Sequence, residues 1–435
     1  MALPEADTLA RVAFRQRRFG RWPDLDGGVR LFNPEMVLVK FRGAKHVSAL
    51  RVEPERELES CRIIAAREDV EFAELDVFQQ RASAPDDPLL TNQWHHQVLG
   101  SYWAWDRGIV SAPVRVAIVD TPFQMDHPDL VANVDPGWDV VEEQPVVAAT
   151  GINHSTLAAG LVAATVGNHL GVAGVGNCRV LPLNVNGAIS EIYNAVIWAA
   201  DHGVRVVNVS WTGADSDTLN AAGAYLKTKA RGLLVMAGVN GTGFLDYPNQ
   251  PDIWCVSMTD SADNQRSRFG HHIDFAAPGW DVFSTAIHSS YGYDSGTSFS
   301  TPVFAGVAAV LFGINPTLGP DDVISVLKAT AADQGAAGWD MYFGWGRIDF
   351  GAAAEAAWRT RPVITSVAWS NELAVVSAEF KSGLAYSLWR ASSPADVSWE
   401  RITNAVALTQ GGIIQFTDPQ AGGDRRFYRI GIETP

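Results

Sequence analysis

The stretch Gly296-Thr297-Ser298-Phe299-Ser300-Thr301-Pro302 leads into a run, 303–312, that is almost wholly apolar. Such a run predicts a buried helix rather than an amphipathic surface helix. Ser298 then lies at the helix N-terminus, where unpaired backbone N–H groups and the helix dipole stabilise negative charge. Ser298 is therefore a candidate nucleophile. The alternative is a Ser/Thr helix cap followed by proline in the first turn, which many proteins contain.

The bulk composition is that of a globular protein. The chain has 435 residues and is 47% hydrophobic, so we expect two or three domains. No uninterrupted apolar run reaches about 18 residues, so no membrane span is expected. The net charge of −15 disfavours binding to nucleic acid or to an anionic membrane. Three widely separated cysteines give neither a disulfide framework nor a metal motif.

Residues 114–357 alternate short β-rich apolar runs with longer helical patterns. This alternation predicts an α/β fold with a mostly parallel sheet and helices on both faces. The predicted strands are 114–119, 180–185, 204–210, 233–237 and 253–258, and the predicted helices between them are 191–202 and 218–231.

The segments on either side of this core have different patterns. Strand-like runs at 36–41 and 70–75 surround a charged helical stretch, which predicts a small α+β unit, and 81–88 has linker composition. After Pro362 only short β-like runs remain, which predicts a small all-β sandwich. We therefore divide the chain into an N-terminal extension 1–34, an α+β unit 35–80, a linker 81–86, the α/β domain 87–360 and a β-domain 361–435.

Two further residues in the α/β domain carry chemistry. The predicted strand 114–119 runs into Asp120, which places a carboxylate at the carboxyl edge of a parallel sheet. His154 begins a helical segment rich in small residues and is a candidate general base. Taken singly, Asp120 fits a turn or capping role equally well, and His154 fits an ordinary surface histidine.

The three local motifs together resemble those of the subtilisin-like serine proteases, or subtilases. Residues 116–121 with 127–130 match the family's aspartate motif, 154–160 most of its histidine motif, and 296–302 its serine motif. The order Asp120, His154, Ser298 is also the family's order. The resemblance implies a serine endopeptidase in which Ser298 attacks a peptide carbonyl, His154 acts as base and acid, and Asp120 orients the imidazole.

The resemblance extends to groups that bind the substrate. Asn240, in the segment 235–241, corresponds to the asparagine that stabilises the oxyanion, although an Asn-Gly turn fits the sequence as well. Substrate is implied to lie along the segment Ser210, Trp211, Thr212 and Gly213. The partner is then a protein or peptide, and the chemistry requires no cofactor.

Some positions depart from the family pattern. Val239 stands in place of glycine just before Asn240, and a β-branched residue resists the backbone angles that glycine permits. This leaves an alternative open, a catalytically impaired subtilase that acts as a protein-binding scaffold. An α/β esterase fits less well, because its motif and triad order differ.

Further expectations depend on the resemblance alone. The 35–80 unit resembles a propeptide that assists folding and then inhibits the enzyme, with self-cleavage between Val77 and Asp87; a permanent packing domain is the alternative. The family also implies a monomer that is secreted or held in the cell envelope, although the first residues lack a signal-peptide pattern. Structural calcium is implied at side chains and carbonyl oxygens of Asp87, Asp129, Val166, Asn168, Leu170 and Val172, where a glycine-rich turn is the alternative.

Overall fold

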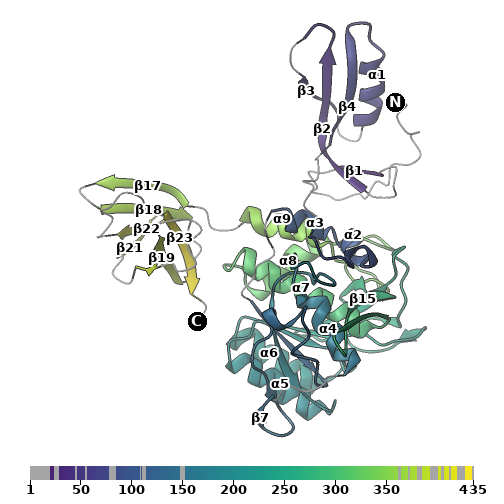
Figure 1. Ribbon diagram of the computed structural model, residues 1–435, viewed down its shortest axis with the longest axis vertical. Coiled ribbons are helices and arrows are strands. Elements are labelled where there is room, and N and C mark those ends of the chain that lie inside the picture. The colour runs from purple at the N-terminus through teal and green to yellow at the C-terminus, as the bar shows by residue number, and fades with distance from the viewer. Residues whose placement is uncertain are drawn as a thin grey trace. The chain divides into compact units, whose positions relative to one another are not determined.

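A computed structural model describes most of the chain (Figure 1). By its internal contacts the chain divides into two units, Met1–Ala84 and Pro85–Pro435, which are described separately below. The structure describes residues 20–23, 29–44, 47–53, 56–77, 85–107, 109, 114–146, 152–360, 364–370, 373–379, 385–391, 400–402, 406–410, 413–418 and 427–433.

The first unit is a four-stranded sheet with one helix. Strand β2 is the centre of the sheet and pairs antiparallel with β1, β3 and β4. Alternate residues of β2, such as Val37 and Val39, are fully buried and pack with Cys61 of the helix. The elements are β1 Gly20–Pro23, β2 Val29–Phe41, β3 Ser48–Arg51, α1 Glu57–Ala65 and β4 Val70–Val77. The sequence predicted the helix and the β2 and β4 strands, whereas β1 and β3 were not predicted.

The core of the second unit is an eight-stranded sheet in the order β14-β12-β10-β9-β5-β8-β6-β7, in which only the β6–β7 pair is antiparallel. The predicted fold, a mostly parallel sheet, is confirmed. The strands are β5 Arg115–Asp120, β6 Trp138–Asp139, β7 Gln144–Pro145, β8 Arg179–Asn184, β9 Val206–Val209, β10 Leu233–Ala237, β12 Trp254–Thr259 and β14 Phe275–Pro278.

Helices cover both faces of this sheet because successive strand residues point to opposite sides. On β5, Val116 and Ile118 belong to the buried cluster that contains residues of α4, α7, α8 and α9. Ala117 and Val119 belong to the other cluster, with residues of α5 and α6, which lie side by side in Figure 1. The helices are α4 Asn153–Ala163, α5 Ile189–Asp201, α6 Asp217–Lys229, α7 Thr297–Ile314, α8 Pro320–Thr330 and α9 Phe350–Thr360.

Smaller elements complete the α/β core. Gly160 of α4 lies against β15 so closely that a Cβ there would be 2.1 Å from Thr285 Oγ1, which is why the helix needs glycine at this position. The remaining elements are the helices α2 His95–Leu99 and α3 Ser101–Trp105, the 3-10 turns η2 Leu90–Asn92 and η3 Val131–Asn133, and the strands β11 Phe244–Leu245, β13 Phe269–Gly270, β15 Val282–Ala286 and β16 Ser290–Asp294.

Helix α7 is the apolar helix predicted from the sequence. Among the described residues it is the one helix long and apolar enough to cross a membrane, but 83% of its residues are buried inside the protein. Its composition therefore follows from its position against the sheet, where α4 and α9 also contact it. The helix reaches 18 residues because Thr297, Ser298, Ser300 and Thr301 precede its apolar run, so it does not contain an uninterrupted apolar run of that length.

The C-terminal strands form two antiparallel sheets, β17-β18-β22-β21 and β20-β19-β23. Val376 and Phe416 of the first sheet and Leu388 of the second belong to one buried cluster, the arrangement of a β-sandwich. The strands are β17 Ile364–Ser370, β18 Leu373–Glu379, β19 Ala385–Ala391, β20 Glu400–Arg401, β21 Val406–Gln410, β22 Ile413–Asp418 and β23 Phe427–Glu433. The sequence predicted strands in this segment but not their pairing into two sheets.

Candidate active site

The site lies at the carboxyl edge of the sheet, where three neighbouring strands end. β5 ends at Asp120, β9 ends just before Ser210, and β10 ends three residues before Asn240. The strand order β10-β9-β5 brings these ends together, as expected for open parallel sheets. Helices α4 and α7 add His154 and Ser298 from their first turns. All five residues line one cavity of about 370 Å³.

Asp120 and His154 form an acid–histidine pair in which the acid is buried. His154 Nδ1 lies 3.3 Å from Asp120 Oδ1, where hydrogen-bond geometry is met, and 3.1 Å from Oδ2. The backbone N–H of Thr121 also donates to Oδ1, at 2.7 Å, and this contact fixes the carboxylate. Asp120 is 2% exposed, whereas the His154 side chain is 37% exposed. The histidine therefore presents its other nitrogen toward the cavity while the acid remains out of solvent.

The charges around His154 favour the imidazolium. Burial lowers the pKa of His154, but the hydrogen bond and the negative charge of Asp120, together with the charge of Asp294, outweigh burial and raise it above the ordinary value. Asp294 ends strand β16 and was not predicted as part of the site. A carboxylate four residues before the nucleophile was the available signal in the sequence.

Ser298 is the second residue of α7, as predicted. Its hydroxyl donates to the backbone carbonyl of Ser210 at 3.2 Å, and the Ser210 hydroxyl donates back to the Ser298 carbonyl at 2.9 Å. Among the described hydrogen bonds, Ser298 has none to His154. In this structure the hydroxyl is therefore directed at the Ser210 carbonyl rather than at the imidazole.

Asn240 has a fixed amide orientation. Its Oδ1 accepts from the Thr297 N–H at 2.9 Å and from the Thr297 hydroxyl at 3.2 Å. The backbone N–H can only donate, so its contact requires the oxygen, and Nδ2 is the group left to donate into the cavity. Thr297 thus positions Asn240, a role that was not predicted. Val239 is not among the residues with positive φ, so its replacement of glycine imposes no backbone strain.

The predicted substrate segment lies partly at the cavity. Ser210, Trp211 and Thr212 line it, whereas Gly213 is not among the lining residues. Trp211 packs over Gly187, where a Cβ would lie 2.5 Å from the indole ring. The Trp211 Nε1 is buried and finds no hydrogen-bond partner in the described part of the chain. A bulky indole therefore forms one wall of the cavity.

The predicted calcium ligands Asp87, Asp129 and Asn168 converge on the loop 166–172. Asp87 accepts from the N–H groups of Gly167 and Asn168, and Asp129 accepts from the Asn168 side chain and the Val172 N–H. Burial raises the pKa of both carboxyl groups. Tyr291, which was not predicted, bonds to Asp129 as well. Among the residues that the structure describes, no group of three or more His, Cys, Asp or Glu side chains could hold a metal.

The chain is similar to a known protein family and to known proteases. The Subtilase family profile matches residues 111–346, more than half of the chain. The halolysin-like extracellular serine protease Nep of Natrialba magadii is 32% identical over 317 residues, which cover 69% of this chain and 58% of Nep. Thermitase of Thermoactinomyces vulgaris is 35% identical over 238 residues, 52% of this chain and 85% of thermitase.

A solved structure gives the same result at the level of the fold. A protease from Pseudoalteromonas arctica PAMC 21717 superposes with a TM-score of 0.55 and 30% identity, covering 63% of this chain and 100% of that protease. The chain spans less than two thirds of Nep and of the halolysin of Haloferax mediterranei. The α/β fold, the motifs and the family profile agree, and the chain belongs to the subtilase family.

Proposed function

We propose that this chain is a serine endopeptidase that hydrolyses peptide bonds through Asp120, His154 and Ser298. The observation that carries the proposal is the convergence of these three residues and Asn240 in one cavity at the carboxyl edge of the sheet. Membership of the subtilase family supports it. A catalytically impaired scaffold would be favoured if one of the four groups lay outside the cavity, and all four line it.

In the proposed reaction the Ser298 hydroxyl rotates from the Ser210 carbonyl toward His154 Nε2. The oxygen attacks the peptide carbonyl carbon while Nε2 takes the hydroxyl proton, and Asp120 stabilises the resulting imidazolium. The carbonyl oxygen becomes an oxyanion that accepts from Asn240 Nδ2 and the Ser298 N–H. His154 then gives its proton to the amine as the C–N bond breaks, and water releases the acyl group by the reverse steps.

The substrate is proposed to bind as an extended strand along residues 210–213, which continue from β9. Backbone pairing of this kind recognises the main chain rather than particular side chains. Trp211 and Thr212 then form the walls that contact the substrate side chains. We therefore expect cleavage of unfolded proteins at many positions.

The decisive experiment is reaction with a serine-directed fluorophosphonate, followed by mass-spectrometric mapping of the modified residue. We expect a single modification at Ser298, and none in the His154→Ala variant, which lacks the base but keeps the serine. A label on another serine, or no label on a folded protein that also fails to cleave casein, would overturn the proposal.

We further propose that the unit around β2 and α1 is a propeptide that inhibits the enzyme until it is removed. The predicted cleavage region, 77–87, lies largely outside the described residues. N-terminal sequencing of active protein tests this proposal, with a new terminus expected in that region. Active protein that still begins near Met1 would favour a permanent packing domain.

We also propose structural calcium at the 166–172 loop. Two buried carboxylates, Asp87 and Asp129, have no lysine or arginine partner among the described ion pairs. Carboxylate oxygens suit this hard cation, and bound calcium would neutralise the two carboxylates. The Asn168 side-chain oxygen, which here accepts from the Leu170 N–H, would join them if the amide turned. A chelator should then lower the melting temperature of the protein but not that of the Asp129→Asn variant.

The remaining proposals concern the setting of the enzyme. Extracellular relatives such as Nep support secretion or attachment to the cell envelope. The sandwich of β17–β23 is proposed to be an accessory domain, and the protein is proposed to act as a monomer without a membrane span. Size-exclusion chromatography with light scattering tests the oligomeric state.

A further inference from the structure

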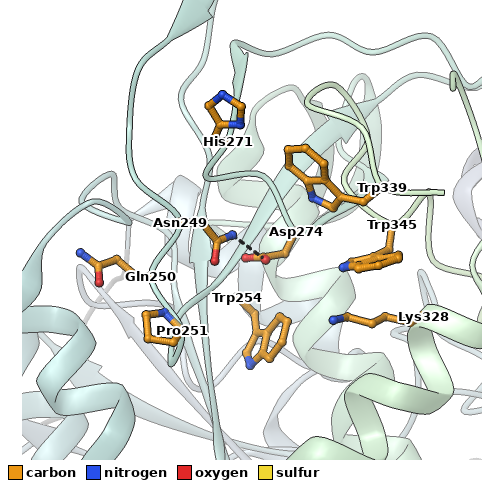
Figure 2. Close-up of a pocket in the computed structure, with 9 residues that line it drawn as sticks. All are labelled: Asn249, Gln250, Pro251, Trp254, His271, Asp274, Lys328, Trp339 and Trp345. Atoms are coloured by element: carbon orange, nitrogen blue, oxygen red, sulfur yellow. Dashed lines mark hydrogen bonds between the residues drawn. The ribbon is translucent and has the colours of Figure 1, made fainter.

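A second cavity, of about 480 Å³, lies at the opposite edge of the same sheet from the catalytic site. Trp254 begins β12 and Asp274 immediately precedes β14, so the cavity forms where these parallel strands start. Figure 2 shows Asp274 near the middle of a ring of side chains that includes Trp254, Trp339 and Trp345. It shares no lining residue with the catalytic cavity.

The cavity offers flat apolar walls. Trp345 is 36% exposed and Trp254 and Trp339 are half-buried, so indole surface remains open to a ligand. His271 stacks parallel to Trp339, with ring planes 12° apart, and extends the aromatic wall. Aromatic side chains that stay partly exposed around one cavity, with a few polar groups among them, are typical of ligand-binding pockets.

Hydrogen-bond donors and acceptors are available between these walls. Asn249 donates its amide N–H to Asp274 at 2.9 Å, and Gln250 donates to Asp217 at 2.9 Å, which leaves both amide oxygens as acceptors. Within the described residues, the indole N–H groups of Trp254 and Trp345 make no hydrogen bond, unlike that of Trp339, which donates to Ile273. A ligand with hydroxyl groups can use both kinds of group at once.

The charges in the cavity oppose a ligand of either sign. The Lys328 ammonium lies 4.5 Å from the Trp345 ring centroid and 5.5 Å from that of Trp254, so it already occupies the position of an organic cation. An anion would meet the Asp274 carboxyl, which is 6% exposed. Burial raises the pKa of this group to about 7, so it is partly ionised at neutral pH. A neutral ligand avoids both conflicts.

A peptide is less suited to this cavity than a compact ligand. β12 is hydrogen-bonded on both sides, by β10 and β14. The outer side of β14 is occupied too, because Ala276 donates to Gly346 and accepts from Ile348. The described part of the cavity thus presents no free strand edge for main-chain pairing.

We propose that this cavity binds a neutral saccharide. A sugar ring stacks its C–H face on an indole and uses its hydroxyl groups both as donors, to the amide oxygens of Asn249 and Gln250, and as acceptors, from the indole N–H groups of Trp254 and Trp345. The protein would then hold glycan, or glycosylated substrate, at a site remote from Ser298. This inference does not depend on the proposed peptidase activity.

The test uses the full chain carrying Ser298→Ala, which prevents self-digestion. Maltose, cellobiose, sucrose and N,N′-diacetylchitobiose are titrated by calorimetry and by saturation-transfer NMR, and a casein-derived peptide is titrated in parallel. We expect at least one saccharide to bind with a Kd of about 1 mM or tighter. The peptide is expected to bind along residues 210–213 and serves as the positive control for a folded protein. No binding by any of the four saccharides would overturn the proposal.

Variants locate the binding to this cavity. Trp345→Ala should weaken the saccharide about tenfold, while Trp345→Phe keeps most of the affinity because it keeps an aromatic face. Trp280→Ala is the matched control, since Trp280 is 43% exposed outside the cavity. Gln250→Ala, expected to cost about threefold to tenfold, serves if Trp345→Ala does not fold. Unchanged affinity in Gln250→Ala, and in Trp345→Ala where that variant folds, would contradict the assignment.

Discussion

The two cavities stand at opposite edges of one sheet, and each is built around a buried aspartate. Asp120 ends β5, contacts His154 and accepts from the Thr121 N–H, so its negative charge has a partner that can become cationic. Asp274 precedes β14, and among the described hydrogen bonds it accepts only from neutral donors, Asn249 and Cys255. Burial raises its pKa to about 7, although the charge of Lys328 acts in the opposite direction. The comparison teaches that burial alone does not make a carboxylate catalytic. Its partners decide whether it orients a base or merely holds a proton.

Removing the nucleophile should have the largest effect. We expect Ser298→Ala to lower turnover about a million-fold, the loss that removal of the serine causes in subtilisin itself. Hydrolysis of a chromogenic peptide measures the loss. Ser325→Ala, on the exposed face of α8, is the control and should keep the full rate. If Ser298→Ala retained more than about a thousandth of the activity, Ser298 would not be the nucleophile. The first cavity would then no longer be distinguished from the second by its catalytic serine.

Removing the oxyanion donor should have the next largest effect. Asn240→Ala leaves the helix and the triad in place but deletes Nδ2, so turnover should fall about 100-fold to 1,000-fold. The KM should change little, because the contact forms mainly in the transition state. Steady-state kinetics separate the two parameters. A rise in KM at unchanged turnover would instead assign Asn240 to substrate binding.

The Asp274 side of the comparison predicts a pH dependence of stability. Its folded pKa, about 7, is raised above the unfolded value, so the folded state holds the proton more tightly. The contribution of Asp274 to the free energy of unfolding is therefore fully present below about pH 4. This contribution is lost as the pH rises through about 7. Asp274→Asn should remove this contribution, on the order of 1 to 4 kcal/mol.

Urea unfolding of the Ser298→Ala protein at pH 5 and pH 8, with and without Asp274→Asn, measures the difference. Asp246→Asn serves as the control because it replaces an exposed carboxylate outside the cavity. If the proteins with and without Asp274→Asn show the same pH dependence, Asp274 is ionised throughout the range from pH 5 to pH 8.

The smallest expected effect concerns the pH profile of catalysis. Asp120 and Asp294 raise the pKa of His154 above its ordinary value, and catalysis requires the neutral base. Activity should therefore rise with pH through that raised pKa. Asp294→Asn should move the acid limb of kcat/KM to lower pH, because one of the charges that favour the imidazolium is gone. Asp281→Asn is the control variant. If the acid limb stays in place in Asp294→Asn, Asp294 does not contribute to the raised pKa of His154.

Most of the catalytic site could be predicted because short sequence motifs determine the local geometry of its residues. Asp120 stands at the end of a strand, and His154 and Ser298 stand at the starts of helices. Each of these positions is determined by about ten residues of local sequence. Thr297 and Asp294 were missed because their roles depend on distant contacts, with Asn240 and with the charge on His154. The tryptophan cavity was missed for the same reason, since Trp254, Lys328 and Trp345 are brought together only by the fold.

The position of α7 has a consequence for how the protein loses activity. Ser298 belongs to a helix whose residues from Phe299 to Phe312 are almost all buried, so the nucleophile is carried by the centre of the core rather than by a loop. Amide hydrogens in such a helix exchange with deuterium only through global opening. Heat inactivation should therefore coincide with cooperative unfolding, and the half-life of the enzyme is set by its unfolding rate.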